Sequence, residues 1–95
     1  MEINNLKITK HALSRSQQRG IKLKMIDFVI NHADKFRLLK EGGESYFISN
    51  KKIKSLISEY RLKPSDSEKL ANLVIVESAG KILTVFKSTR PQPSL

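Results

Sequence analysis

With 95 residues, of which 39% are hydrophobic, the chain is long enough for one small core and too short for two. It has no cysteine, which excludes disulfides and cysteine nucleophiles, and no apolar stretch near the roughly 20 residues that span a bilayer, so we expect a cytoplasmic protein without a membrane partner. The formal net charge of +9 is typical of proteins that bind polyanions, usually nucleic acid, although an acidic protein partner or solubility alone would fit the same charge.

Two short helices are predicted in the first third of the chain. Thr9 is a suitable N-cap, no Gly or Pro interrupts residues 10–19, and Gly20 is suited to end a helix. A second helix is predicted from about Lys22 to His32, because apolar residues recur there at helical spacing: Ile21, Met25, Ile26, Val29 and Ile30.

The middle of the chain is predicted to form a hairpin and a third helix. Extended patterns at 35–40 and 44–49 are separated by Glu41-Gly42-Gly43, which is typical of a hairpin turn. Ser49 or Asn50 can then cap a helix over 51–62, because apolar residues occur at i, i+3, i+4 and i+7, namely Ile53, Leu56, Ile57 and Tyr60. Propensity alone would also allow a strand here.

Residues 63–68 are predicted to form a polar loop, and the last third a second hairpin. Its strands cover 70–78 and 82–88, and the first should be central because residues 73–76 are apolar on both faces. The expected fold is therefore α+β, an N-terminal helix pair and a small antiparallel four-stranded sheet in the order α-α-β-β-α-β-β. It occupies a single domain over residues 1–88, and residues 89–95, with two prolines, should form a flexible tail.

The first predicted helix carries one imidazole and two guanidinium groups at a spacing of four residues: His11, Arg15 and Arg19. Residues four apart lie nearly one above the other on a helix, so these side chains form one polar ridge. A solvated helix face would explain such a pattern. However, no carboxylate is interleaved, and like charges at i, i+4 oppose helix stability by a few tenths of a kcal/mol. An external anion is therefore the better interpretation.

The chemistry that fits this ridge is cleavage of a phosphodiester without a metal ion. Attack of an RNA 2'-OH on its neighbouring phosphate needs a base, an acid and cations near the phosphorane. His11 can serve in one proton transfer, with Arg15 and Arg19 as phosphate clamps. The second proton-transfer group would have to come from elsewhere, and Thr84, Lys87 and Ser88 on the final strand are the candidates.

Strand alternation separates these candidates. Thr84 should share a face with Ile82 and Phe86, whereas Lys87 should share one with Leu83 and Val85, so without a bulge both cannot meet the first helix. For Thr84, a hydroxyl satisfied by a neighbour and a catalytic residue are equally good interpretations.

Further basic residues are candidates for nucleic-acid binding: Lys10, Lys51, Lys52, Lys54, Arg61 and Lys87. His32 is better explained by a favourable interaction with the helix dipole. Tyr46, Phe47 and Tyr60 could stack on bases, although core packing is the commoner role. The chain has no P-loop, dinucleotide fingerprint or His-x-x-x-His pair, so neither a metal ion nor a cofactor is expected.

The pattern His11-Ala12-x-x-Arg15 followed by Arg19-Gly20-Ile21, with a late strand Gly80 to Phe86, resembles a family of small uncharacterised prokaryotic domains. That family looks like part of the metal-independent ribonuclease superfamily that contains barnase, EndoU, colicins and RelE-type toxins. The resemblance implies a toxin that cleaves RNA, paired with an acidic antitoxin. It also implies a site formed by His11, Arg15, Arg19 and Thr84, between the first helix and the sheet.

Overall fold

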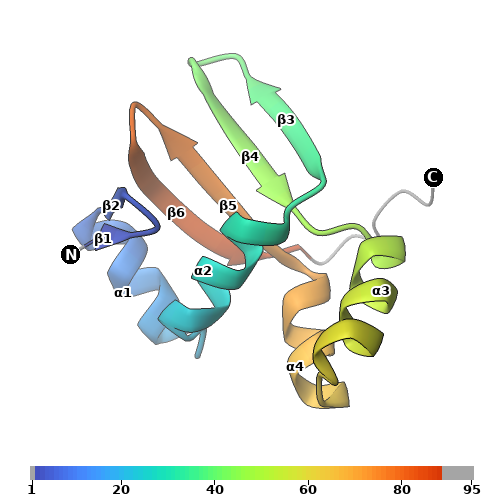
Figure 1. Cartoon of the computed structure of the whole chain (residues 1–95). Coiled ribbons are helices and arrows are strands. Elements are labelled where there is room, and N and C mark those ends of the chain that lie inside the picture. Colours follow the sequence, from blue (N-terminus) through green and yellow to red (C-terminus); the bar gives the residue numbers. More distant parts are fainter. Residues whose placement is uncertain (1, 89–95) are drawn as a thin grey trace.

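A computed structural model describes residues 2–88 and shows an α+β fold with a six-stranded mixed sheet (Figure 1). The predicted tail at 89–95 lies outside the described residues. The sheet order is β1-β2-β6-β5-β4-β3. In chain order the elements are β1 Glu2–Ile3, β2 Leu6–Ile8, α1 Lys10–Gln18, α2 Leu23–His32, β3 Lys35–Leu39, β4 Gly43–Phe47, α3 Asn50–Tyr60, α4 Pro64–Ala71, β5 Leu73–Ser78 and β6 Lys81–Lys87.

The prediction of a four-stranded sheet preceded by two helices is wrong, because a hairpin comes first. β1 pairs antiparallel with β2, and β2 pairs parallel with β6, which makes the sheet mixed. Asn4 and Asn5, both at positive φ, form the turn, a conformation that asparagine tolerates better than most residues. Strands of two and three residues are too short to show a period-2 pattern, so the sequence did not reveal them.

The predicted polar loop at 63–68 is also wrong, since α4 begins there. Pro64 occupies the first turn of this helix, where a backbone N–H has no partner within the helix and its absence costs nothing. Asp66 lies in the same turn, where its negative charge interacts favourably with the helix dipole. Leu70 is the buried residue of α4. The strand predicted from Leu70 consequently starts at Leu73.

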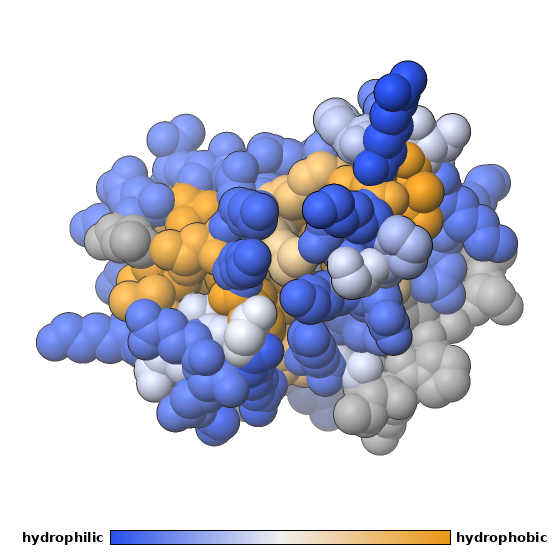
Figure 2. Space-filling model, turned by 90° about the horizontal axis from the view of Figure 1, so that it is seen from below, coloured by the Kyte–Doolittle hydropathy of each residue, from blue (hydrophilic) through white to orange (hydrophobic). Residues whose placement is uncertain are grey.

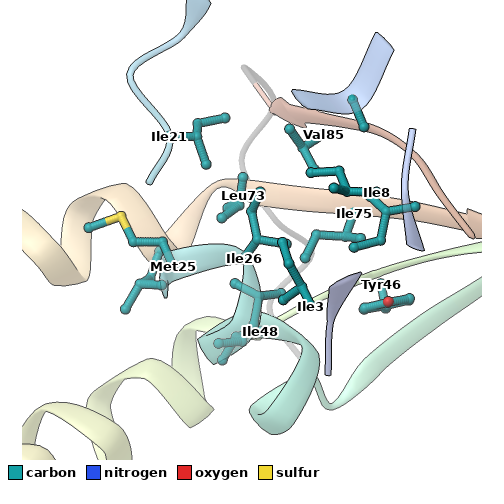
Figure 3. Packing of buried hydrophobic residues seen from close by; sticks show 14 of the residues in the cluster. Ile3, Ile8, Ile21, Met25, Ile26, Tyr46, Ile48, Leu73, Ile75 and Val85 are labelled. Atoms are coloured by element: carbon teal, nitrogen blue, oxygen red, sulfur yellow. The ribbon is translucent and has the colours of Figure 1, made fainter. Parts of the chain in front are cut away.

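The core lies between the sheet and the helices. Helices α1 and α2 pack against one face of the sheet, whereas α3 and α4 contact each other at the other end of the molecule (Figure 1). Buried side chains from strands β1, β2, β4, β5 and β6 point toward those of α2 (Figure 3). β5 is an interior strand, as predicted, with Leu73, Val74 and Ile75 all buried. Among residues 2–88, no helix has the length and apolar character needed to span a bilayer.

Thr9 fixes the start of α1 to strand β6. Its side-chain oxygen caps the helix by accepting from the N–H of Ala12 at 3.1 Å, as predicted, and its hydroxyl donates to the carbonyl of Ile82 at 3.0 Å. The N–H of Thr9 also donates to that carbonyl. After α1, Gly20 adopts a φ of +65°, which reverses the chain into α2. The first helix is therefore held at both ends.

Candidate functional site

The α1 ridge (His11, Arg15 and Arg19) flanks the buried side of its helix. Ala12 and Ser16 form that buried side, and the Ser16 hydroxyl is satisfied by the carbonyl of Leu13 at 2.7 Å. Arg15 is half-buried, whereas His11 and Arg19 are exposed. Arg19 is the C-cap residue and its backbone N–H bonds to the carbonyl of Arg15. The helix thus holds all three side chains on one flank, with two of them open to solvent.

The α1 ridge is an uncompensated cationic surface. Helix α1 contains no acidic residue, and Lys10 adds a further exposed cation at its first position. Within residues 2–88, none of the three ridge side chains makes a hydrogen bond or ion pair with another residue. An anion with several oxygens could therefore be received there without displacing an internal partner.

A bulge in β6 determines where Thr84 points. Val76 pairs with Thr84, but the next residue, Glu77, pairs with Ile82, so Leu83 is the extra residue. Ile82 and Val85 consequently both face the core, where each is fully buried. The prediction that Ile82 and Thr84 share a face is therefore wrong.

Thr84 alternates with Val85 and points away from the core against which α1 packs. It is half-buried. Lys87 follows Thr84 by three residues, and the bulge does not lie between them, so the two side chains are on opposite faces as predicted. Lys87 pairs with the core residue Leu73. Strand β2 pairs with β6 only as far as Ile82, so the edge of β6 beyond Ile82 is not paired with β2. A ligand of the α1 ridge could reach Thr84 only by passing around this edge.

The outer face, the side of β3–β6 that points away from the core, carries a row of residues across four strands. Thr84 pairs with Val76, Val76 with Ser45, and Ser45 with Arg37. Arg37 is exposed and was not among the sequence candidates. Its alternation with Phe36 and Leu38 could have assigned Arg37 to the outer face. That assignment also needs the strand register, which the sequence does not specify.

Of the basic residues proposed for nucleic-acid binding, Lys10 adjoins the α1 ridge, whereas those of α3 do not. Lys51, Lys52 and Lys54 belong to α3, and Arg61 is its C-cap in a left-handed conformation with φ of 53°. α3 lies at the opposite end of the molecule from α1 (Figure 1). Hydrophilic residues dominate the helix-bearing side, with hydrophobic residues visible between them (Figure 2). The α3 cations are therefore separate from the α1 ridge, and Lys87 lies on a third element, β6.

The aromatic candidates for base stacking have different environments. Tyr46 belongs to the core, and burial, followed by the charges of Glu77 and Glu44, raises the pKa of its hydroxyl, which keeps it neutral. Phe47 is half-buried and Tyr60 is exposed. His32, predicted to interact with the dipole at the end of α2, lies in its last turn, where its ring is tilted against Phe28 and edge-on to Tyr60.

A hollow of about 430 Å³ lies between the two hairpin turns, and its lining includes Leu38, Gly43, Glu44, Glu77 and Ala79. Its two carboxylates suit a cation better than a phosphate, and α1 contributes nothing to it. In the described part of the chain, no three His, Asp or Glu side chains are placed to hold a metal ion together.

Comparison of the chain with protein-family models, with curated proteins and with solved structures finds no match.

Proposed function

We propose that this domain binds RNA through the α1 ridge and cleaves it without a metal ion, by attack of a 2'-OH on the adjacent phosphate. The observation that carries the proposal is the exposure of His11 and Arg19 beside Arg15, on a helix without carboxylates. The net charge of +9 would draw a polyanion to the domain.

In this mechanism Arg15 and Arg19 donate to the phosphate oxygens and stabilise the charge of the phosphorane. His11 either accepts the proton of the attacking 2'-OH or donates one to the leaving 5'-oxygen. Because His11 is exposed, solvent water can carry the other proton.

RNA or DNA binding without cleavage is the second candidate function. The position of Thr84 favours it, because this side chain faces away from the core on which α1 packs. His11 is then the one proton-transfer group that the α1 ridge supplies. Such a module would bind with an affinity that falls steeply with salt and does not depend on His11.

RNA cleavage in the presence of EDTA separates these functions. The wild-type chain, His11→Ala and the matched control Gln17→Ala, an exposed residue on another side of α1, are each incubated with total RNA. We expect scission by the wild type and by Gln17→Ala, and a reduction of about 100-fold or more in His11→Ala. Binding with no scission by any variant would support the second function, and equal scission by all three would remove His11 from the mechanism.

A toxin role with an acidic antitoxin is part of the same proposal, and it derives from the family resemblance. Expression of the domain should arrest growth, and the product of the neighbouring gene should relieve the arrest. Unimpaired growth of cells that make active ribonuclease would contradict the toxin role and leave the ribonuclease activity standing.

A further inference from the structure

Two carboxylates oppose each other across strands β4 and β5. Glu44 and Glu77 are direct partners in the antiparallel register, both are half-buried, and both line the hollow between the hairpin turns. Like charges placed directly opposite each other in a sheet are destabilising. Within residues 2–88, neither carboxylate forms a hydrogen bond or an ion pair. The pair therefore has no internal counter-ion, although the chain carries a formal charge of +9.

The hydroxyl of Tyr46 is a further polar group without a partner beside these carboxylates. Tyr46 lies two residues from Glu44 and pairs with Ile75, which lies two residues from Glu77, so all three polar side chains share one face of the sheet. Burial and then the charges of Glu77 and Glu44 raise the pKa of this hydroxyl. Tyr46 is 4% exposed, and its hydroxyl forms no hydrogen bond with any described residue. A buried hydroxyl normally has a partner, and here a ligand can supply one.

Strand β3 adds exposed apolar side chains to the same face. Leu38 pairs with Glu44 and Phe36 pairs with Tyr46, so both lie beside the polar groups. They are 84% and 63% exposed, the highest values among the large hydrophobic residues of the described chain. The ring of Phe36 contacts that of Tyr46 at a centroid distance of 6.0 Å. A ligand at the carboxylates would therefore also meet an apolar and aromatic wall.

We propose that this cluster, the acidic pocket, binds an alkylguanidinium group such as the side chain of an arginine. A guanidinium presents five N–H donors in a planar fork, which can serve both carboxylates and the Tyr46 oxygen together. It is also weakly hydrated and stacks on aromatic rings, so it suits the neighbouring Phe36, while its alkyl stem can lie over Leu38. The acidic pocket consists of Phe36, Leu38, Glu44, Tyr46 and Glu77.

Other cations suit the acidic pocket less well. No three His, Asp or Glu side chains of the described residues are placed to hold a metal ion, and the apolar wall offers such an ion no ligand. An ammonium group is compact and strongly hydrated, so it gains less than a guanidinium from a site with an apolar wall. The hollow of about 430 Å³ has room for a side chain in addition to its charged head.

Titration of the full chain with three singly charged probes, followed by NMR, tests the choice of ligand. The probes are butylguanidinium and two capped tripeptides, acetyl-Gly-Arg-Gly-amide and acetyl-Gly-Lys-Gly-amide. Both guanidinium probes should shift the resonances of the acidic pocket, and the lysine peptide should bind several-fold more weakly than the arginine peptide. Tighter binding of the arginine peptide than of butylguanidinium would identify a polypeptide ligand, and equal binding a free alkylguanidine. A lysine peptide that binds as tightly as the arginine peptide would overturn the guanidinium assignment.

Amide variants of the carboxylates test the site itself. Glu44→Gln and Glu77→Gln should each weaken the arginine peptide by about 10-fold, and the control Glu59→Gln, at an exposed position on α3, should leave the affinity unchanged. Tyr46→Phe should weaken binding several-fold.

Urea titration separates a binding role from a structural one. Glu44→Gln relieves the like-charge pair, and Tyr46→Phe removes a hydroxyl without an internal partner, so neither should lower the free energy of unfolding. A wild-type chain that binds neither guanidinium probe would overturn the proposal. Affinity that is unchanged in both glutamine variants would overturn it too, and an accompanying loss of stability would assign the carboxylates a structural role.

Discussion

Asp34 links the end of α2 to the start of α3. Its carboxylate accepts from the N–H and the hydroxyl of Ser49 at 2.7 and 2.6 Å, while the Ser49 oxygen caps α3 by accepting from the N–H of Lys52. Partial burial acts to raise the pKa of Asp34, but these bonds, the Asp34 N–H and the charge of Lys35 outweigh it, so the pKa lies below its usual value. The sequence offered Ser49 or Asn50 as the cap, and it could not show that Ser49 is supported by a residue 15 positions earlier.

We expect Asp34→Ala to lower the free energy of unfolding by about 1 kcal/mol at pH 7, a value kept small because the carboxylate is partly exposed to solvent. A group with a lowered folded pKa stabilises the fold above its unfolded pKa of about 3.9, and this contribution is lost as the pH falls through the folded pKa. Urea titrations of the wild type and Asp34→Ala at several pH values check this loss of stability. A difference in the free energy of unfolding that stays constant down to pH 2 would contradict the role given to the Asp34 carboxylate.

Among the elements, those with a clear period were predictable and those without were not. Helices α2 and α3 follow from the spacing of their apolar residues, α1 from the residues that cap it, and the two large hairpins from extended patterns separated by turn residues. The β1–β2 hairpin is too short for any period, and α4 is a helix whose first residues, proline and serines, are typical of loops. The bulge in β6 shows no sequence signal, and it determines the direction of Thr84.

Gly43 allows the two hairpins to approach each other. A Cβ at this position would lie 2.8 Å from the carbonyl oxygen of Glu77 and 3.1 Å from the Cβ of Ser78. Because the first of these atoms is backbone, the strands themselves would have to shift. Gly43→Ala should therefore lower the free energy of unfolding by about 1–3 kcal/mol in urea titration. An unchanged or higher stability would show that β4 and β5 separate easily.

For the whole molecule, net charge was readable from the sequence and its distribution was not. The sequence made Lys51, Lys52 and Lys54 candidates for nucleic-acid binding in addition to the α1 ridge, and the fold places α1 and α3 at opposite ends (Figure 1). Attraction of a polyanion depends on the total charge, but binding depends on which group meets the phosphates.

Paired double variants identify that group. Arg15→Gln with Arg19→Gln removes two charges from the ridge, and Lys51→Gln with Lys54→Gln removes two from exposed positions on α3. The ridge variant should reduce the slope of log affinity for single-stranded RNA against log salt by about 0.7 for each phosphate that the protein no longer neutralises, and the α3 variant should leave the slope nearly unchanged. A larger effect of the α3 variant would move the interface to α3.

The chemical nature of the RNA ends tests the central claim most directly. A defined RNA is incubated in EDTA with the wild-type chain or His11→Ala, and the ends are identified by mass spectrometry. Attack by the 2'-OH predicts 2',3'-cyclic phosphate and 5'-hydroxyl ends from the wild type and their absence in His11→Ala. Ends with a 3'-hydroxyl and a 5'-phosphate, or cyclic phosphate ends formed equally by His11→Ala, would contradict the account.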